Sequence, residues 1–467
     1  MKRVSGLDAA FLYMETPSSH MHVASVGIFD PSTAPEYPSY ERVLELIEER
    51  LHLYPPARWR LAPVPFELHH PLWVDDPDFD LEYHVRRAAL PAPGGIRELA
   101  EFTADVTSRP IDRSRPLWEV YLVEGLEGGH FAGITKTHHA AVDGVSGVEM
   151  AVVLMDLQPD PPPVSPPEEP WTPERLPTDI ELVTNALGSL VRQPVRMIST
   201  VRRTLSSVVT ARRRPRDPDV VPPPAPFSAP RTSLNVSLTP HRRLAFVDVP
   251  LDDVKAVKNA LGGTVNGVVL SVCSGALRRH FQRRGETVDA DLVASIPISV
   301  RTEAQQQTLG NRISTMLVGL ASTVDDPVER LRRIGQATKD AKTEHNAVGA
   351  DSLQNWAEFM APAVAARAAR FYSRLQLASR HRPFFNLTIS NVPGPMFPLY
   401  SYGSKVVASY PIGPIFDGGA LNITVMSYLG QMFFGLNACR EAVPDVDAIA
   451  YDIEGELQEL MKAASAR

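Results

Sequence analysis

The sequence predicts two α/β domains of similar, sandwich-like build. The chain has 467 residues, 44% of them hydrophobic, which is enough for two hydrophobic cores of ordinary size. Helical and strand-like patterns are intermixed in both halves, as expected when helices cover sheets in each. Two proline-rich segments separate these halves, with nine prolines in 159–177 and seven in 215–230. We therefore expect an N-terminal domain over 1–158, a linker over 159–235 and a C-terminal domain over 236–467.

Hydrophobic periodicity assigns the elements in order along the chain. In the N-terminal half, apolar residues recur at helical spacing in 41–53 and 96–108, whereas strand-like runs occupy 118–126 and 130–139. The C-terminal half shows helical spacing in 251–262 and 265–285, and strand-like runs in 292–300, 313–322 and 386–394. No repeated period is evident along the chain.

One uncharged stretch, residues 418–439, is long enough to resemble a membrane span. It contains Asn422, Ser427, Gln431 and Asn437, and its apolar residues alternate. Leu429 and Gly430 stand where a tight turn would fall. We expect a β-hairpin there and no transmembrane helix.

Charge and cysteine content narrow the classes of function. The formal net charge is −7, which gives no electrostatic sign of nucleic-acid binding. Cys273 and Cys439 are the only cysteines, so neither a disulfide framework nor a cysteine-based zinc site is expected. This usage fits a reducing cytoplasm. The first residues include acids and lack a continuous apolar run, so no signal peptide is expected there.

A basic amphipathic pattern fills the middle of the linker. Residues 182–216 contain eight arginines and no acid, with leucine, valine and isoleucine between them. Such a helix can lie on an anionic membrane surface. The alternative is a linker helix that packs on its own protein, with its arginines solvated.

The stretch KTHHAAVDGVSG, residues 136–147, places two adjacent histidines at the end of a predicted strand. Neighbouring side chains on a strand point to opposite faces, so only one of His138 and His139 can face a given cleft. Asp143 can brace the following loop, Gly144 permits unusual backbone angles, and Ser146–Glu149 has the capping-box pattern of a helix start. A neutral histidine held in this way is suited to act as a general base.

Three other interpretations of the histidine pair were considered. A serine hydrolase is disfavoured because GVSGV, residues 144–148, fails the nucleophile-elbow pattern. A metal site is disfavoured because adjacent histidines diverge and no H-x-x-x-H spacing occurs, although His20 and His22 could serve as further ligands. A purely structural role, as buried core histidines, stays open on this motif alone. Without a protein nucleophile, the base would deprotonate a substrate hydroxyl or thiol directly.

The motif H-H-x-x-x-D-G resembles the signature of coenzyme A-dependent acyltransferases of the chloramphenicol acetyltransferase-like fold, shared with peptide-synthetase condensation domains. Flanking stretches are similar to the bacterial wax ester synthase/acyl-CoA:diacylglycerol acyltransferase family over almost the whole chain. These are SGLDAAFLYMETPSSHMHV (5–23), RPLWEVYLVEGL (115–126), TVNGVVLSVCSGALRRHF (264–281), LGNRISTMLVGL (309–320), LTISNVPGP (387–395) and ALNITVMSY (420–428).

The resemblance implies two chloramphenicol acetyltransferase-like domains with the active-site channel between them. It implies that His139 is the general base, that His138 shapes the site, and that Asp143 and Gly144 fix the loop. Pro116, Leu117 and Trp118 match a motif thought to shape the pocket, although Trp118 could equally fill core beside its strand. The acyl-CoA is a substrate, and neither a metal nor another cofactor is implied.

The chain matches the family at further positions and differs from it at two, Gly267 and His20. Asn266 matches the first residue of an Asn-Asp motif and could steady an oxyanion, or could simply cap a helix. Gly267 stands where the family has the aspartate. His20 stands where the family more often has proline, and we expect it on the surface. Asn391, in SNVPGP (390–395), could line the cleft, although a rigid turn is the simpler interpretation of that segment.

The function implied is transfer of a long-chain fatty acyl group from acyl-CoA to diacylglycerol, a long-chain alcohol, or both. Arg367, Arg370 and Arg374 could bind coenzyme A phosphates or lipid headgroups, or form a solvated helix face. We expect a cytoplasmic protein bound peripherally to the inner face of the membrane or to lipid droplets. Two rivals remain: an acyltransferase of the same superfamily that uses carrier-bound donors, and a lipid-surface protein with an idle histidine site.

Overall fold

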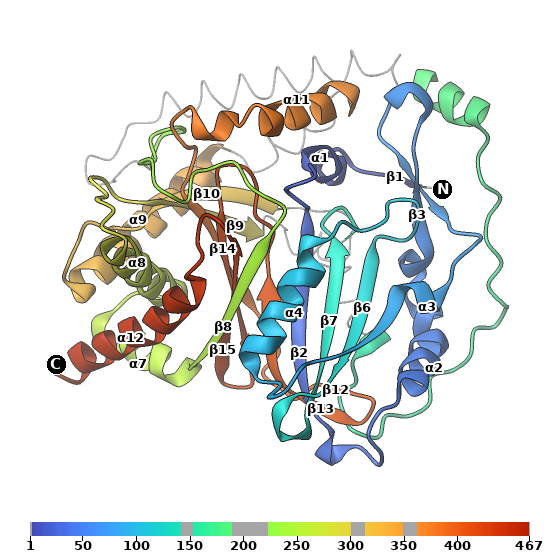
Figure 1. Cartoon of the computed structure of the whole chain (residues 1–467), viewed down its shortest axis with the longest axis horizontal. Helices are drawn as coiled ribbons and strands as arrows, with labels where there is room; N and C mark the ends of the chain where they lie inside the picture. Colours follow the sequence, from blue (N-terminus) through green and yellow to red (C-terminus); the bar gives the residue numbers. More distant parts are fainter. Residues whose placement is uncertain (1, 142–152, 189–222, 300–312, 349–361, 467) are drawn as a thin grey trace.

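The computed structural model describes residues 2–141, 153–188, 223–299, 313–348 and 362–466. Figure 1 shows two mixed α/β halves side by side, each with its own sheet. This arrangement confirms the predicted fold class of intermixed helices and strands. The predicted boundaries at 158 and 236 stay a prediction.

The sheet of the N-terminal half has six strands in the order β12-β13-β2-β7-β6-β5. Four of them come from the first 140 residues: β2 (His22–Asp30), β5 (Val85–Ala89), β6 (Trp118–Glu124) and β7 (Phe131–His138). The predicted strands 118–126 and 130–139 are therefore confirmed. A small separate sheet has the order β1-β4-β3 and comprises β1 (Lys2–Arg3), β4 (Leu72–Asp75) and β3 (Trp59–Ala62).

The sheet of the C-terminal half also has six strands, in the order β10-β9-β11-β14-β15-β8. Its strands are β8 (Arg242–Pro250), β9 (Val293–Ser299), β10 (Ile313–Gly319), β11 (Leu387–Pro393), β14 (Leu421–Tyr428) and β15 (Gln431–Cys439). β14 and β15 form the predicted hairpin, with Tyr428 paired to Gln431 and the turn residues Leu429 and Gly430 at positive φ. Nearly every residue of β15 is buried, so both faces of this strand are covered.

Two strands late in the chain complete the N-terminal sheet. β12 (Tyr400–Ser401) and β13 (Ser404–Ile412) extend it, and β13 pairs antiparallel with β2. β13 also contacts β14 and β15 of the other sheet, so it joins the two halves. The contact with β15 is close enough that a side chain at Gly435 would clash with the carbonyl oxygen of Pro411. Glycine is required at that position for the halves to approach each other.

Helices cover the sheets and fill the junction between them (Figure 1). The C-terminal half has α7 (Leu251–Leu261), α8 (Val265–Arg283), α9 (Pro327–Val348) and α12 (Val446–Ser465). The N-terminal half has α1 (Gly6–Met14), α2 (Tyr40–Arg50), α3 (Leu81–His84) and α4 (Ile96–Ser108). α4 contacts both β8 and β2 and so lies where the halves meet, while α11 (Pro362–Arg374) packs against α1.

The proline-rich segment 159–177 contains no helix or strand, as predicted. It leads to a short helix over 179–188, in which Leu182 and Ala186 pack against Val64, Leu72 and Val74. The start of the basic amphipathic pattern therefore packs on the protein itself. Its eight arginines lie outside the described residues, so the membrane interpretation stays a prediction.

Within the described ranges, no single helix is long and apolar enough to cross a membrane. α7 and α8 pass that test together, on length and composition, across a bend of 100°. Most of α8 is buried in the core of the C-terminal half.

Candidate active site

Backbone hydrogen bonds hold the two adjacent histidines at the end of β7. The His138 N–H donates to the Leu117 carbonyl at 2.9 Å, and the His139 N–H donates to the Met21 carbonyl at 2.7 Å. The His138 ring then turns back on its own loop, because its Nδ1 accepts from the Ala140 N–H at 3.1 Å. The peptide before His139 is thus fixed by the Met21 carbonyl, and the peptide after it is fixed by the His138 ring.

The two histidines lie in different surroundings, as the strand geometry predicted. His138 is only 1% exposed, whereas His139 is partly exposed. The His139 ring stacks on Phe11 of α1, with 4.0 Å between ring centroids and 17° between planes. Burial lowers the pKa of His139 to about 4, and a hydrogen bond with its own backbone offsets this only partly. The imidazole is therefore neutral at pH 7, as a proton acceptor must be.

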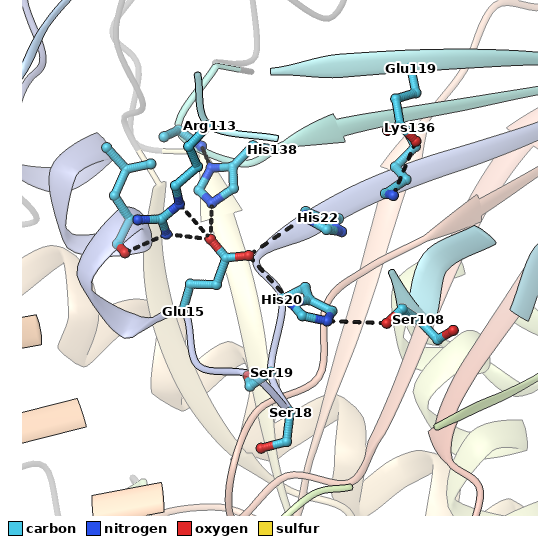
Figure 2. Close-up of polar contacts among 12 residues, drawn as sticks. Glu15, Ser18, Ser19, His20, His22, Ser108, Arg113, Glu119, Lys136 and His138 are labelled. Carbon is cyan, nitrogen blue, oxygen red and sulfur yellow. Dashed lines mark hydrogen bonds and ion pairs between the residues drawn. The ribbon is translucent and has the colours of Figure 1, made fainter. Parts of the chain in front are cut away.

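A buried carboxylate, Glu15, gathers one arginine and three histidines around it (Figure 2). Arg113 donates to Glu15 through Nε at 2.9 Å and through a second, shorter contact. His138 Nε2 lies 3.3 Å from Oε2 of the same carboxylate, and His20 Nδ1 lies 3.3 Å from Oε1. His22 Nε2 is further away, at 3.8 Å.

Burial and neighbouring charges shift the pKa values of Glu15, His138 and His22. Burial alone would raise the pKa of Glu15, but polar contacts with His138 and His20 and the charge of Arg113 hold it well below its ordinary value. Burial lowers the pKa of both His138 and His22, and the charge of Lys136 adds to the effect on His22. The cluster is thus an ionised carboxylate paired with a guanidinium, with His138 and His22 neutral at pH 7.

The surface position expected for His20 is wrong. His20 is buried, and its Nε2 donates to the Ser108 carbonyl at the end of α4 at 3.1 Å. The loop between α1 and β2 folds inward here because Glu15 supplies a buried acceptor for the other ring nitrogen. His20 and His22 are two residues apart along an extended segment, so their stacked rings lie on the same side.

Glu15 and Arg113 were missed as site residues in the sequence. They are 98 residues apart along the chain, and nothing in their local patterns marks them as partners. A usable signal was the spacing of His20 and His22, which places two histidines on one side of an extended segment shortly after an acid.

Trp118 fills core beside its strand, as one of the two interpretations expected. Pro116, Leu117 and Trp118 are all buried, and the Trp118 Nε1–H donates to the Ala57 carbonyl at 2.7 Å. The His84 ring stacks on Trp118 at 4.5 Å. The motif acts on the site through its backbone, because the Leu117 carbonyl is the acceptor for the His138 N–H.

Asn266 does not cap its helix, because Thr264 is the N-cap of α8 and accepts from the Gly267 N–H at 3.0 Å. Instead the amide of Asn391, on β11, donates to Asn266 Oδ1 at 3.4 Å. This pairing leaves the Asn266 amide nitrogen to act as a donor. A Cβ at Gly267 would make only ordinary contacts with Thr264 and Leu331, so steric crowding does not explain its glycine.

SNVPGP is not simply a turn, because β11 continues through Pro393. Arg367, Arg370 and Arg374 are exposed on α11. Arg367 lies 3.9 Å from Glu67, whereas none of the three has a described contact with His139. Asp143, Gly144 and the capping box Ser146–Glu149 lie outside the described residues.

Over the described part of the chain, no group of three or more histidine, cysteine or acidic side chains is arranged to hold a metal ion. A groove of about 300 Å³ lies between α4 and β8 and is lined by Ile96, Arg97, Ala100, Arg243, Ala245, Phe246 and Asp447. None of the described site residues lines it.

Comparison with known proteins gives the class to which this fold and site belong. Residues 4–269 match the family model of the wax ester synthase/diacylglycerol acyltransferase catalytic domain, and residues 309–461 match that of the WS/DGAT C-terminal domain. A Mycobacterium tuberculosis protein with a provisional name as a diacylglycerol O-acyltransferase is 37% identical, over 99% of this chain and 91% of its own length.

Solved structures agree with these matches. A wax ester synthase/diacylglycerol acyltransferase from Marinobacter aquaeolei VT8 is 30% identical, with a TM-score of 0.69 over 99% of this chain and all of its own. The starter condensation domain of rhizomide synthetase is 13% identical with a TM-score of 0.54, over 99% of this chain and 95% of that one, and shares the fold alone.

The protein is therefore an acyltransferase with the two-domain, chloramphenicol acetyltransferase-like fold that the sequence predicted. Within that class, the chain belongs to the wax ester synthase/diacylglycerol acyltransferase family.

Proposed function

We propose that this protein transfers a long-chain fatty acyl group from acyl-CoA to diacylglycerol, to a long-chain alcohol, or to both. The products are triacylglycerol or a wax ester, together with free coenzyme A. The observation that carries the proposal is His139, a partly exposed and neutral imidazole whose neighbouring peptides and ring are fixed. The named activities of the Marinobacter and Mycobacterium relatives support these substrate classes.

His139 acts as the general base in one direct displacement. Its neutral imidazole takes the proton from the acceptor hydroxyl as the oxygen attacks the thioester carbonyl. The tetrahedral intermediate then collapses, the carbon–sulfur bond breaks, and the coenzyme A sulfur leaves with the proton that His139 held. A base with a pKa of about 4 is too weak to ionise an alcohol beforehand, so proton transfer accompanies attack. The reaction uses no covalent acyl-enzyme, no metal and no further cofactor.

Asn266 supplies an amide donor for the oxyanion of that intermediate. Its Oδ1 is engaged by Asn391, which orients Nδ2 as the free donor. A single donor of this kind contributes about 3–4 kcal/mol to transition-state stability in other enzymes. Burial of the reacting groups keeps water from the thioester.

Both substrates are amphipathic, and α11 offers a surface suited to the interface where they reside. Arg370 and Arg374 are exposed beside the exposed apolar side chains of Val364 and Phe371. The neighbouring turn over 65–67 holds Phe66 with 87% of its surface exposed. Cationic and apolar side chains together bind anionic lipid surfaces. These side chains support the proposal that the protein binds peripherally to the cytoplasmic face of the membrane or to lipid droplets.

The function is tested by offering the purified protein palmitoyl-CoA with diacylglycerol or hexadecanol and measuring free coenzyme A and the ester product. Acceptor-dependent release with ester formation supports the proposal. Release only from carrier-bound acyl donors would reassign the protein to carrier-dependent chemistry. Binding to lipid without turnover on any donor would leave a lipid-surface protein with an idle site.

Surface binding is tested by flotation with phosphatidylglycerol–phosphatidylcholine vesicles. We expect the double variant Arg370→Gln/Arg374→Gln to bind about thirty times more weakly, since each of the two cations contributes about 1 kcal/mol near an anionic surface. The matched control is Arg332→Gln/Arg333→Gln, which removes two exposed arginines from α9. Equal binding by both double variants would rule out α11 as the contact surface.

A further inference from the structure

The partners of the Glu15 carboxylate flank His139 on both sides. His138 precedes His139 in the chain, and Arg113 joins Glu15 to α1, which carries the ring stacked on His139. The cluster in Figure 2 is therefore a frame around the general base of the proposed function.

The first connection runs through His138. Its Nδ1 accepts from the Ala140 N–H, so the ring proton must be on Nε2, which lies 3.3 Å from Glu15. A carboxylate at that position favours this tautomer, as second-shell partners of functional histidines do. The opposite tautomer would place an N–H against the Ala140 N–H and open the turn directly after His139.

The second connection runs through α1. Arg113 donates to Glu15 and also to the Leu12 carbonyl at 2.7 Å, so one guanidinium fixes two points at the end of this helix. Phe11 precedes Leu12 and forms the stacked face of His139. Without the carboxylate, Arg113 would be left without its anionic partner, and the end of α1 would lose its connection to the strand that bears His139.

The charge on Glu15 is required for both connections. The side chain is 10% exposed and its pKa is well below the ordinary value, so it is ionised throughout the working pH range. An ionised acceptor forms stronger hydrogen bonds than a neutral amide of the same shape. Replacing it with glutamine therefore keeps the volume and weakens both connections.

We propose that Glu15 is a positioning residue for His139, which it holds through His138 on one side and through Arg113 and Phe11 on the other. This inference rests on the proposed function for its effect on rate. Its effect on the His139 ring is independent of that function and can be measured without substrate.

A second buried carboxylate provides the matched control. Glu456, on α12, accepts from Arg279 at 2.6 Å and from buried Arg330, and it lies in the helices of the C-terminal half. Glu456→Gln removes the same kind of charge from the same kind of arginine pairing. It has no contact with the histidine cluster.

The decisive measurement is the rate at which diethyl pyrocarbonate modifies His139, followed by mass spectrometry of the fragmented peptide. We expect Glu15→Gln to raise this rate about tenfold, because charge-assisted hydrogen bonds of this kind shift local equilibria by that order. Glu456→Gln should leave it unchanged. An unchanged rate in Glu15→Gln, or an equal rise in both variants, would overturn the proposal.

Steady-state kinetics provide a second test of the role of Glu15. Glu15→Gln should lower kcat about 10- to 100-fold with KM unchanged, since misplacing a reacting group by about 1 Å costs that much. In a His139→Ala background, the same change should cause no further loss. An equal further loss in that background would reduce Glu15 to a structural ion pair.

Misfolding of the variant and failure of the proposed function can each be told apart from failure of the Glu15 proposal. If Glu15→Gln does not fold, as judged by circular dichroism, Glu15→Asp takes its place, because it keeps the charge and withdraws the carboxylate by one carbon. If the wild-type protein releases no coenzyme A with any acceptor, the proposed function fails. The modification rates still decide the role of Glu15 in that case.

Discussion

Lowering the pH tests the environment of His139 directly, because protonation would remove the proposed general base. Burial lowers the pKa of this imidazole from the ordinary value of 6.5 to about 4. The base is neutral above the pKa and lost below it, so the acidic limb of kcat/KM should have its midpoint near pH 4. kcat/KM is the appropriate quantity because it reports groups of the free enzyme.

The expected change of kcat/KM with pH follows from the fraction of the His139 imidazole that is protonated. At pH 6 a histidine with a pKa near 4 is about 1% protonated, whereas one at the ordinary value is about three-quarters protonated. We therefore expect kcat/KM at pH 6 to equal that at pH 8, instead of falling about fourfold.

The assay measures coenzyme A by chromatography of quenched samples, with palmitoyl-CoA below its KM and a saturating acceptor. Far-ultraviolet circular dichroism at each pH checks that the protein stays folded. An acidic limb near pH 6.5 in a folded protein would refute the argument that burial controls the basicity of His139.

Four further substitutions test other parts of the structure. Phe11→Ala should lower kcat about tenfold in steady-state assays by freeing the stacked ring of His139, and an unchanged kcat would deny the stack a role. Asn266→Ala should lower kcat about 10²- to 10³-fold, as loss of an oxyanion donor does. Asn391→Ala should cost less, and the double variant should be no slower than Asn266→Ala; additive losses would contradict the pairing. Gly435→Ala should lower the free energy of unfolding by about 1–3 kcal/mol in urea titrations, and an unchanged midpoint would contradict the close approach of the two sheets.

The local pattern of apolar residues was sufficient to predict the helices and strands that carry the candidate site. The strand ending at His138 and the buried helix α8 follow from alternation and from helical spacing of apolar residues, which are short-range signals. The divergence of His138 and His139 follows from strand geometry alone. The role proposed for His139 rests on the resemblance to a family, because the histidine pattern alone left a structural role open.

Long-range contacts could not be predicted in the same way. Glu15 and Arg113 meet because the segment between α4 and β6 lies against the end of α1. The expectation that His20 lies on the surface failed for this reason, since its buried acceptors come from α1 and α4. The addition of β13 to the N-terminal sheet is likewise a pairing between distant segments, which no local pattern encodes.

The central claim, that His139 is the base of an acyl transfer, is tested most directly by one substitution. Coenzyme A release from palmitoyl-CoA is measured with diacylglycerol or hexadecanol for the wild-type protein, for His139→Ala and for the control His130→Ala, which removes a histidine just before β7. The account predicts acceptor-dependent release that falls about 10²- to 10⁴-fold in His139→Ala and is unchanged in His130→Ala. Release that persists at the wild-type rate in His139→Ala would contradict it.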